Sequence, residues 1–219
     1  MCSISVIEWI CNQALKQSNE MQNARVLEVG SKNVNGSIRR LINNIWKPSE
    51  YIGVDISSGK GVDRIVDVTN LFDTFGGEAF NAVICTEVLE HVRLWRTAVC
   101  NLKAVLRTNG LLLLTTRSYG MPYHGYPSDY WRFEVSDMEK IFADMEYEIE
   151  PDQNGVFVCA KNSYSFNPLN PKISLEHIPL YSVTLGHRTL HSSELTTKRK
   201  FLLVARKLGE RFGINVNVI

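Results

Sequence analysis

The sequence predicts an α/β protein built on a doubly wound, mostly parallel sheet. Through the first 163 residues, short strand-like segments alternate with segments whose apolar residues recur at helical spacing. Residues 111–114 are four leucines in a row, which is typical of a strand that crossover helices bury on both faces. This alternation favours right-handed crossovers, with helices on both faces of one sheet.

Local patterns place the individual elements. Residues 4–15 are amphipathic and predict a helix, and two more helices are expected at 37–46, ended by Pro48, and at 94–106. The first five strands are expected at residues 25–30, 51–55, 64–67, 80–85 and 110–116.

The pattern changes after the fifth strand. Residues 117–132 are rich in glycine, proline and tyrosine and predict a long loop, and a short helix is expected at 136–143. Two further strands, at 147–150 and 156–160, flank a segment that ends in Asn154-Gly155. Because Asn-Gly is a strong turn signal, we expect these two strands to form an antiparallel hairpin.

The chain divides into a domain at residues 1–163 and a C-terminal extension at residues 164–219. The domain holds 16 Lys and Arg against 20 Asp and Glu, whereas the extension holds 8 against 3. Little periodicity precedes a predicted helix at 198–212, whose apolar face must be buried against something. We expect the extension to be a lid, a dimer arm that makes a homodimer, or an element that docks on an acidic partner.

Composition excludes several classes of protein. Hydrophobic residues make up 44% and charged residues 21%, which is ordinary for a globular domain. No apolar run approaches the roughly 18 residues that a membrane span needs. The N-terminus has no basic leader, and the five cysteines are scattered, which favours reduced thiols over disulfides. We therefore expect a soluble, cytoplasmic protein.

The loop after the first strand suits a small ligand. Gly30 and Gly36 have no Cβ, so a ligand can approach the backbone closely at the carboxyl end of the strand. Glu28 lies two residues before Gly30, where it would repel a diphosphate and attract a cationic amino-acid group. The G-x-G-x-x-G spacing of dinucleotide-binding proteins is absent.

Two more carboxylates close the next two strands. Asp55 ends the second strand, in position to accept hydrogen bonds from both hydroxyls of a ribose. Asp67, with Val68 beside it, ends the third and can meet the exocyclic amine of an adenine. Each carboxylate alone is also explained by capping of a strand or helix. Three of them at the ends of three successive parallel strands indicate a nucleoside ligand.

Four segments match a known family: Leu27-Glu28-Val29-Gly30-Ser31, Gly53-Val54-Asp55, Glu87-Val88-Leu89-Glu90-His91-Val92, and the turn at 106–112. In these segments the chain resembles class I S-adenosylmethionine-dependent methyltransferases of the type 11 kind, over roughly residues 24–160. The resemblance implies a Rossmann-like sheet of seven strands in the order 3-2-1-4-5-7-6, with strand seven antiparallel. It also implies S-adenosyl-L-methionine as the cofactor.

The resemblance implies a role for each part of this edge of the sheet. Glu28 and Gly30 would serve the methionine end of the cofactor and Asp55 the ribose. Thr86 and Glu87 would form the rim beside the sulfonium. The glycine loop is longer than the compact family form, which leaves open whether Ser31, Lys32 or Asn35 touches the cofactor. The expected cofactor-binding residues are Glu28, Gly30, Ser31, Asn35, Gly36, Asp55, Ile56, Asp67, Val68, Thr86, Glu87 and His91.

The loop at 119–133 follows the fifth strand, where open α/β folds commonly build substrate sites. We expect His124 and Asp129 to be the catalytic residues, with His124 as general base because its ordinary pKa lies near neutrality. A structural role is the alternative for His124, and core packing is the alternative for Trp131 and Phe133. His91 is expected to line the cofactor pocket rather than to transfer a proton.

No metal site is expected. The histidines of the extension, His177, His187 and His191, do not form a metal-binding pattern with Glu176 and Glu194.

The expected function is S-adenosylmethionine-dependent methyl transfer to a small molecule, a hydroxylated metabolite or a sugar-containing compound. One alternative is an NAD(P)-dependent oxidoreductase, against which Glu28 and the missing glycine pattern count. Another is a non-catalytic, cofactor-binding partner subunit. A nucleic-acid acceptor is disfavoured because the domain is acidic and because Cys85-Thr86-Glu87-Val88 stands where an Asn/Asp-Pro-Pro-Tyr motif would lie.

Overall fold

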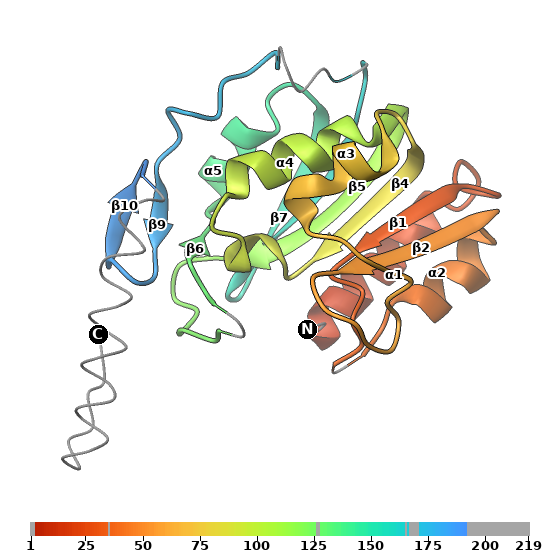
Figure 1. The fold of residues 1–219 in the computed structure, drawn as a ribbon, viewed down its shortest axis with the longest axis horizontal. Coiled ribbons are helices and arrows are strands. Elements are labelled where there is room, and N and C mark those ends of the chain that lie inside the picture. Colours follow the sequence, from red (N-terminus) through yellow and green to blue (C-terminus); the bar gives the residue numbers. More distant parts are fainter. Residues whose placement is uncertain (1–2, 35, 126–127, 165, 167–170, 192–219) are drawn as a thin grey trace.

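The computed structural model describes residues 3–34, 36–125, 128–164, 166 and 171–191. Its centre is a seven-stranded sheet in the order β3-β2-β1-β4-β5-β8-β7 (Figure 1). Neighbouring strands from β3 to β5 are parallel, and β8 alone runs antiparallel to its two neighbours. This confirms the expected fold and strand order. The labels differ from the expected numbers only because the short β6 lies outside this sheet.

The strands of this sheet are β1 (Arg25–Val29), β2 (Glu50–Asp55), β3 (Arg64–Ile65), β4 (Phe80–Thr86), β5 (Leu106–Arg117), β7 (Glu146–Asp152) and β8 (Gly155–Lys161). The α-helices of the described ranges are α1 (Ile4–Lys16), α2 (Arg39–Trp46), α3 (Leu71–Phe75), α4 (Trp95–Ala104) and α5 (Val135–Ile141). Single 3-10 turns occupy Val68–Asn70 and Leu89–His91.

Helices cover the sheet on both faces (Figure 1). On one face, α1 and α2 pack on strand residues that include Leu111 and Leu113. On the other, α3, α4 and α5 pack on residues that include Leu112 and Leu114. Alternate side chains of β5 therefore enter two separate cores, as the unbroken run of leucines predicts.

Two strands differ in length from expectation for local reasons. The third strand ends at Ile65, because Asp67 instead caps the 3-10 turn that follows. The hairpin strands are longer than expected, since Asp152 pairs with Gly155 and leaves a two-residue loop. Pro151 is tolerated within β7 because β7 is an edge strand.

The described part of the extension is more regular than its sequence predicts. Strands β9 (Leu180–Ser182) and β10 (His187–Thr189) form a small sheet with β6 (Trp131–Arg132). Arg96 of α4 donates hydrogen bonds to the carbonyls of Leu175 (2.8 Å) and Ile178 (2.9 Å), and both of these side chains are buried. The extension thus packs on the domain as far as residue 191. The predicted helix at 198–212 lies outside the described residues.

None of the helices described here is long and apolar enough to cross a membrane.

Candidate active site

The turn after β1 is tight. Gly30 has a φ of +77°, and its N–H and that of Ser31 both donate to the carbonyl of Val54, at 2.9 and 3.0 Å. A Cβ on Gly30 would lie 2.3 Å from Val88 Cγ2. Only glycine fits at such a position. The turn therefore lies directly against the segment that follows β4.

Glu28 is almost fully buried beneath this turn. Its Oε2 accepts a hydrogen bond from the Tyr51 hydroxyl at 2.9 Å. Burial raises the pKa of Glu28 to about 7, although Tyr51 and Arg39 act to lower it. A cationic ligand group beside Glu28 would favour the ionised carboxylate.

Asp55 lies where β2 ends, with its carboxylate at the same edge of the sheet. Oδ1 accepts from the N–H of Ser57 at 3.0 Å and from its hydroxyl at 3.2 Å, and Oδ2 from the N–H of Lys32 at 3.4 Å. Ile56 beside it is 55% exposed. Ser31 Oγ is buried and has no hydrogen-bond partner in the part of the chain that the structure describes. These two loops thus present one carboxylate and one unpaired hydroxyl.

Asp67 and Val68 have clear structural roles. The Asp67 carboxylate is exposed and accepts from the N–H and the hydroxyl of Thr69, both at 2.8 Å, which caps the 3-10 turn. Val68 is only 3% exposed and belongs to the core. The capping alternative for Asp67 is therefore realised, and its contact with an adenine stays a prediction.

Gly36 and Asn35 complete the expected glycine loop. The N–H of Gly36 donates to Asn33 Oδ1 at 3.1 Å, and its φ is +141°. Asn35 lies outside the described residues.

Thr86 and Glu87 form a buried turn at the end of β4. Glu87 has a φ of +57°, its N–H donates to the Thr115 carbonyl, and its Oε1 accepts from the Thr115 hydroxyl, both at 2.9 Å. Arg117 forms an ion pair with the same carboxylate. Burial, followed by repulsion from Glu90, raises the pKa of Glu87 to about 7. This turn carries a strained backbone of the kind that clusters at functional sites.

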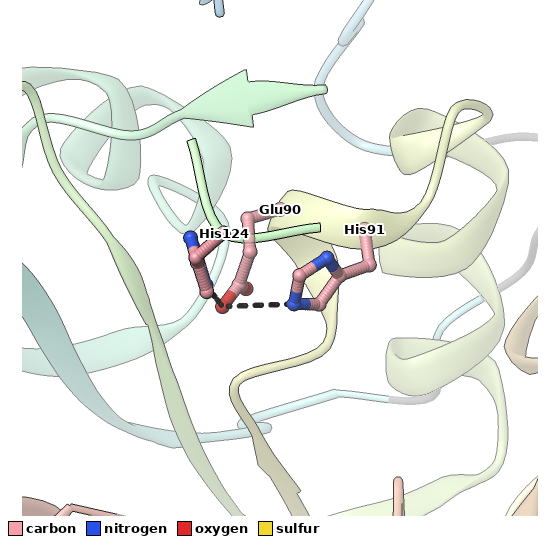
Figure 2. A group of neighbouring side chains, drawn as sticks. All are labelled: Glu90, His91 and His124. Carbon is pink, nitrogen blue, oxygen red and sulfur yellow. Dashed lines mark ion pairs between the residues drawn. The ribbon is translucent and has the colours of Figure 1, made fainter. Parts of the chain in front are cut away.

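Glu90, His91 and His124 converge next to this turn (Figure 2). Glu90 Oε1 lies 3.8 Å from His91 Nε2 and 3.9 Å from His124 Nε2. Glu90 is fully buried, and burial raises its pKa. Its other oxygen, Oε2, accepts from the Thr116 hydroxyl at 2.8 Å. The two imidazole rings lie edge to face, with their centres 5.1 Å apart.

A buried ion pair holds His124 in place. Asp129 Oδ2 lies 3.0 Å from His124 Nδ1 and accepts from the backbone N–H of His124 at 2.9 Å. Arg132 grips Asp129 with two bonds of 2.6 and 2.7 Å, and also donates to the carbonyls of Met121 and Pro122. Five donors on one planar group are well suited to such a role. Arg132 thus fixes the loop that carries His124.

The charges of this pair follow from these contacts. Burial alone would raise the pKa of Asp129, but the bonds from Arg132 and His124 outweigh it and hold that pKa below its usual range. The Asp129 carboxylate in turn raises the pKa of His124. Burial lowers the pKa of His91, whose Nδ1 donates to the carbonyl of Ser128 at 2.5 Å. His124 and Asp129 therefore form a dyad, with His91 beside it.

The structure thus brings His124, Asp129 and His91 together, as a joint site requires. Trp131 and Phe133 are fully buried in the core, which is the packing alternative. Sequence reasoning did not assign Glu90 a role, although Glu90 lies between the two histidines. A carboxylate directly before His91 within a matched motif was the one available signal.

The comparisons with known proteins agree with this geometry. Residues 10–155 match the model of a family described as a methyltransferase domain. The chain belongs to this family. The match confirms the expected family and enzyme class, and S-adenosylmethionine is the cofactor of such enzymes. It lends no support to the oxidoreductase or partner-subunit alternatives.

One relative and two solved structures illustrate the similarity. Polyketide synthase ThaQ of Burkholderia thailandensis is 30% identical over 132 residues, which are 50% of this chain and 6% of that protein. A Burkholderia thailandensis 1,6-didemethyltoxoflavin-N1-methyltransferase, with its substrate and S-adenosylhomocysteine bound, is 13% identical at a TM-score of 0.53, over 72% of this chain and 79% of that one. The CurJ carbon methyltransferase is 14% identical at a TM-score of 0.56, over 73% and 54%. At these identities the solved structures support the fold alone.

Proposed function

We propose that this chain transfers a methyl group from S-adenosylmethionine to a hydroxyl of a small metabolite or sugar-containing compound. The His124–Asp129 dyad carries this proposal, because Nδ1 faces Asp129 and leaves Nε2 to act on the acceptor. The dyad is on the loop after β5, next to the turn that follows β4. Loops at this edge hold substrates in open α/β folds.

Each expected residue has a part in cofactor binding. Glu28 attracts the ammonium group of the methionine end, and Asp55 accepts from the ribose hydroxyls. Gly30 lets the backbone approach the ligand closely, and the unpaired Ser31 hydroxyl offers it a further polar contact. Glu87 and Thr86 line the rim beside the sulfonium.

Methyl transfer asks for alignment and for removal of one proton. The acceptor oxygen attacks the methyl carbon as the carbon–sulfur bond breaks, which leaves S-adenosylhomocysteine. The hydroxyl proton passes to His124 Nε2, and Asp129 stabilises the imidazolium that forms. The raised pKa of His124 suits a base that must hold this proton.

We further propose that the acceptor is not a nucleic acid, since the domain holds more acidic than basic residues. A cytoplasmic location fits the thiols of Cys11, Cys85, Cys100 and Cys159, which are free. A homodimer through the extension stays a prediction, because residues 192–219 lie outside the described ranges.

The first experiment is calorimetric titration with S-adenosylhomocysteine, run beside NAD⁺ and with an Asp55→Ala variant. We expect binding of S-adenosylhomocysteine that is lost in the variant, and no binding of NAD⁺. An intact protein that ignores S-adenosylhomocysteine would overturn the proposal.

The acceptor class is tested by transfer of a labelled methyl group to a panel of phenols, polyols and glycosides. His124→Asn is expected to abolish transfer while keeping affinity for S-adenosylhomocysteine. The matched control, His177→Asn, changes a histidine of the extension and is expected to keep full activity. Transfer that survives in His124→Asn would reject the dyad as base.

A further inference from the structure

We propose that Glu90, His91 and His124 bind a divalent transition-metal ion of the Zn²⁺ class (Figure 2). One ligand atom from each residue, Glu90 Oε1 and the two Nε2 atoms, lies within 4.8 Å of the others. Ligands at tetrahedral angles around Zn²⁺ lie about 3.4 Å apart. Since the two printed carboxylate–imidazole separations are 3.8 and 3.9 Å, small side-chain rotations bring the donors into range.

Both imidazoles are oriented as metal ligands are. A carbonyl oxygen can only accept, so the Ser128 carbonyl requires a proton on His91 Nδ1 and leaves the lone pair on Nε2. Asp129 imposes the same tautomer on His124 through Nδ1. Ligating histidines typically have their second nitrogen held by a carbonyl or carboxylate in this way. Both lone pairs therefore face Glu90 Oε1.

The carboxylate supplies an independent observation. Glu90 is fully buried, and its Oε1 has no hydrogen-bond partner within the described ranges, whereas Oε2 is bonded to Thr116. A buried acceptor left without a partner costs free energy. A bound cation would satisfy this oxygen and offset the burial of its charge. Arg117, the nearest other cation, is already paired with Glu87.

The donor set selects the ion. Two imidazole nitrogens and one carboxylate suit Zn²⁺ or Mn²⁺ better than Mg²⁺, which prefers an all-oxygen shell. Three protein ligands leave a position open, as in catalytic zinc sites. In the proposed methyltransferase, on which this role rests, the open position would take the acceptor hydroxyl. The ion would lower the pKa of that hydroxyl, which then loses its proton to solvent rather than to His124.

Binding of the metal alone tests the site. Protein stripped with a chelator is titrated calorimetrically with ZnCl₂, MnCl₂ and MgCl₂, and Co²⁺ is added as a spectroscopic probe of coordination. We expect one equivalent of Zn²⁺, with Mg²⁺ at least tenfold weaker. Glu90→Gln and His124→Asn are each expected to weaken Zn²⁺ at least tenfold and to abolish the Co²⁺ bands. The control His177→Asn/His191→Asn is expected to leave both unchanged.

Two outcomes overturn the inference: no binding of Zn²⁺, or equal binding in the wild type and in both ligand variants. Circular dichroism checks that each variant is folded, and His124→Asn serves if Glu90→Gln is not. S-adenosylhomocysteine is titrated into the same stripped protein. Cofactor binding without metal binding rejects the metal site alone, whereas metal binding without cofactor binding rejects the proposed function.

Discussion

Gly30 and Val88 are in such close contact that no side chain fits between them: a Cβ on Gly30 would lie 2.3 Å from Val88 Cγ2. This contact joins the loop after β1 to the turn after β4. The expected methionine end of the cofactor and the rim beside its sulfonium lie on these two segments. Their relative position therefore depends on the absence of one methyl group.

Replacement of Gly30 by alanine tests this contact. A positive φ costs an alanine about 1 kcal/mol, and overpacking adds roughly 1–3 kcal/mol. Gly76 has nearly the same φ, +76°, but nothing within 4 Å of a Cβ. Urea unfolding should thus show a larger loss for Gly30→Ala than for Gly76→Ala, and only Gly30→Ala should lose S-adenosylhomocysteine binding. Equal losses of stability would contradict the close contact.

The buried carboxyl of Glu28 should make stability depend on pH. Its pKa is raised from 4.5 to about 7, so between these values the folded state holds a proton that the unfolded state has lost. Stability therefore falls as pH rises through this window and levels off above it, by at most about 3 kcal/mol. The difference between wild type and Glu28→Gln, measured by urea unfolding from pH 4 to 8, isolates this contribution. Parallel curves for the two proteins would show that Glu28 does not titrate in this way.

The ion pair between Arg132 and Asp129 should be costly to break. Both side chains are about 1% exposed, so Arg132→Met leaves a buried carboxylate unpaired and should cost about 3–5 kcal/mol. The double variant Arg132→Met/Asp129→Leu should regain part of this loss. As a control, Glu20→Gln removes the exposed partner of Lys161 and should cost less than about 1 kcal/mol. A loss as small for Arg132→Met would refute its anchoring role.

Arg96 should hold the extension on the domain. Arg96→Met removes the two hydrogen bonds to the carbonyls of Leu175 and Ile178. Hydrogen exchange should then accelerate at β9 and β10 but not at β4, because local opening does not require global unfolding. Lys140→Met, at an exposed cation of α5, serves as control. Unchanged exchange at β9 would mean that burial of Leu175 and Ile178 suffices.

The sequence predicts the central sheet because its signals are local. The four leucines of β5 and the Asn-Gly turn before β8 each specify an element without knowledge of its neighbours. The small sheet of β6, β9 and β10 lacks such signals. Its strands are two or three residues long, and they pair only because β9 meets a strand from a distant loop.

The site was predictable to a similar limit. Parallel strands bring their carboxyl ends to one edge, so Glu28 and Asp55 could be placed from their positions alone. The role of Glu90 could not, because it depends on burial and on the approach of His124 from a loop that Arg132 organises. Nor does sequence alone distinguish a ligand-binding Asp67 from one that caps a turn.

Both edges of the seven-stranded sheet are unsuited to adding another strand. At one edge, β3 is only two residues long. At the other, β7 carries three glutamates and Pro151. Lys16 and Trp9 of α1 bond to Glu148 and Glu150 there. A second copy aligned along β7 would set its own glutamates against these, so the acidic edge opposes aggregation through strand pairing.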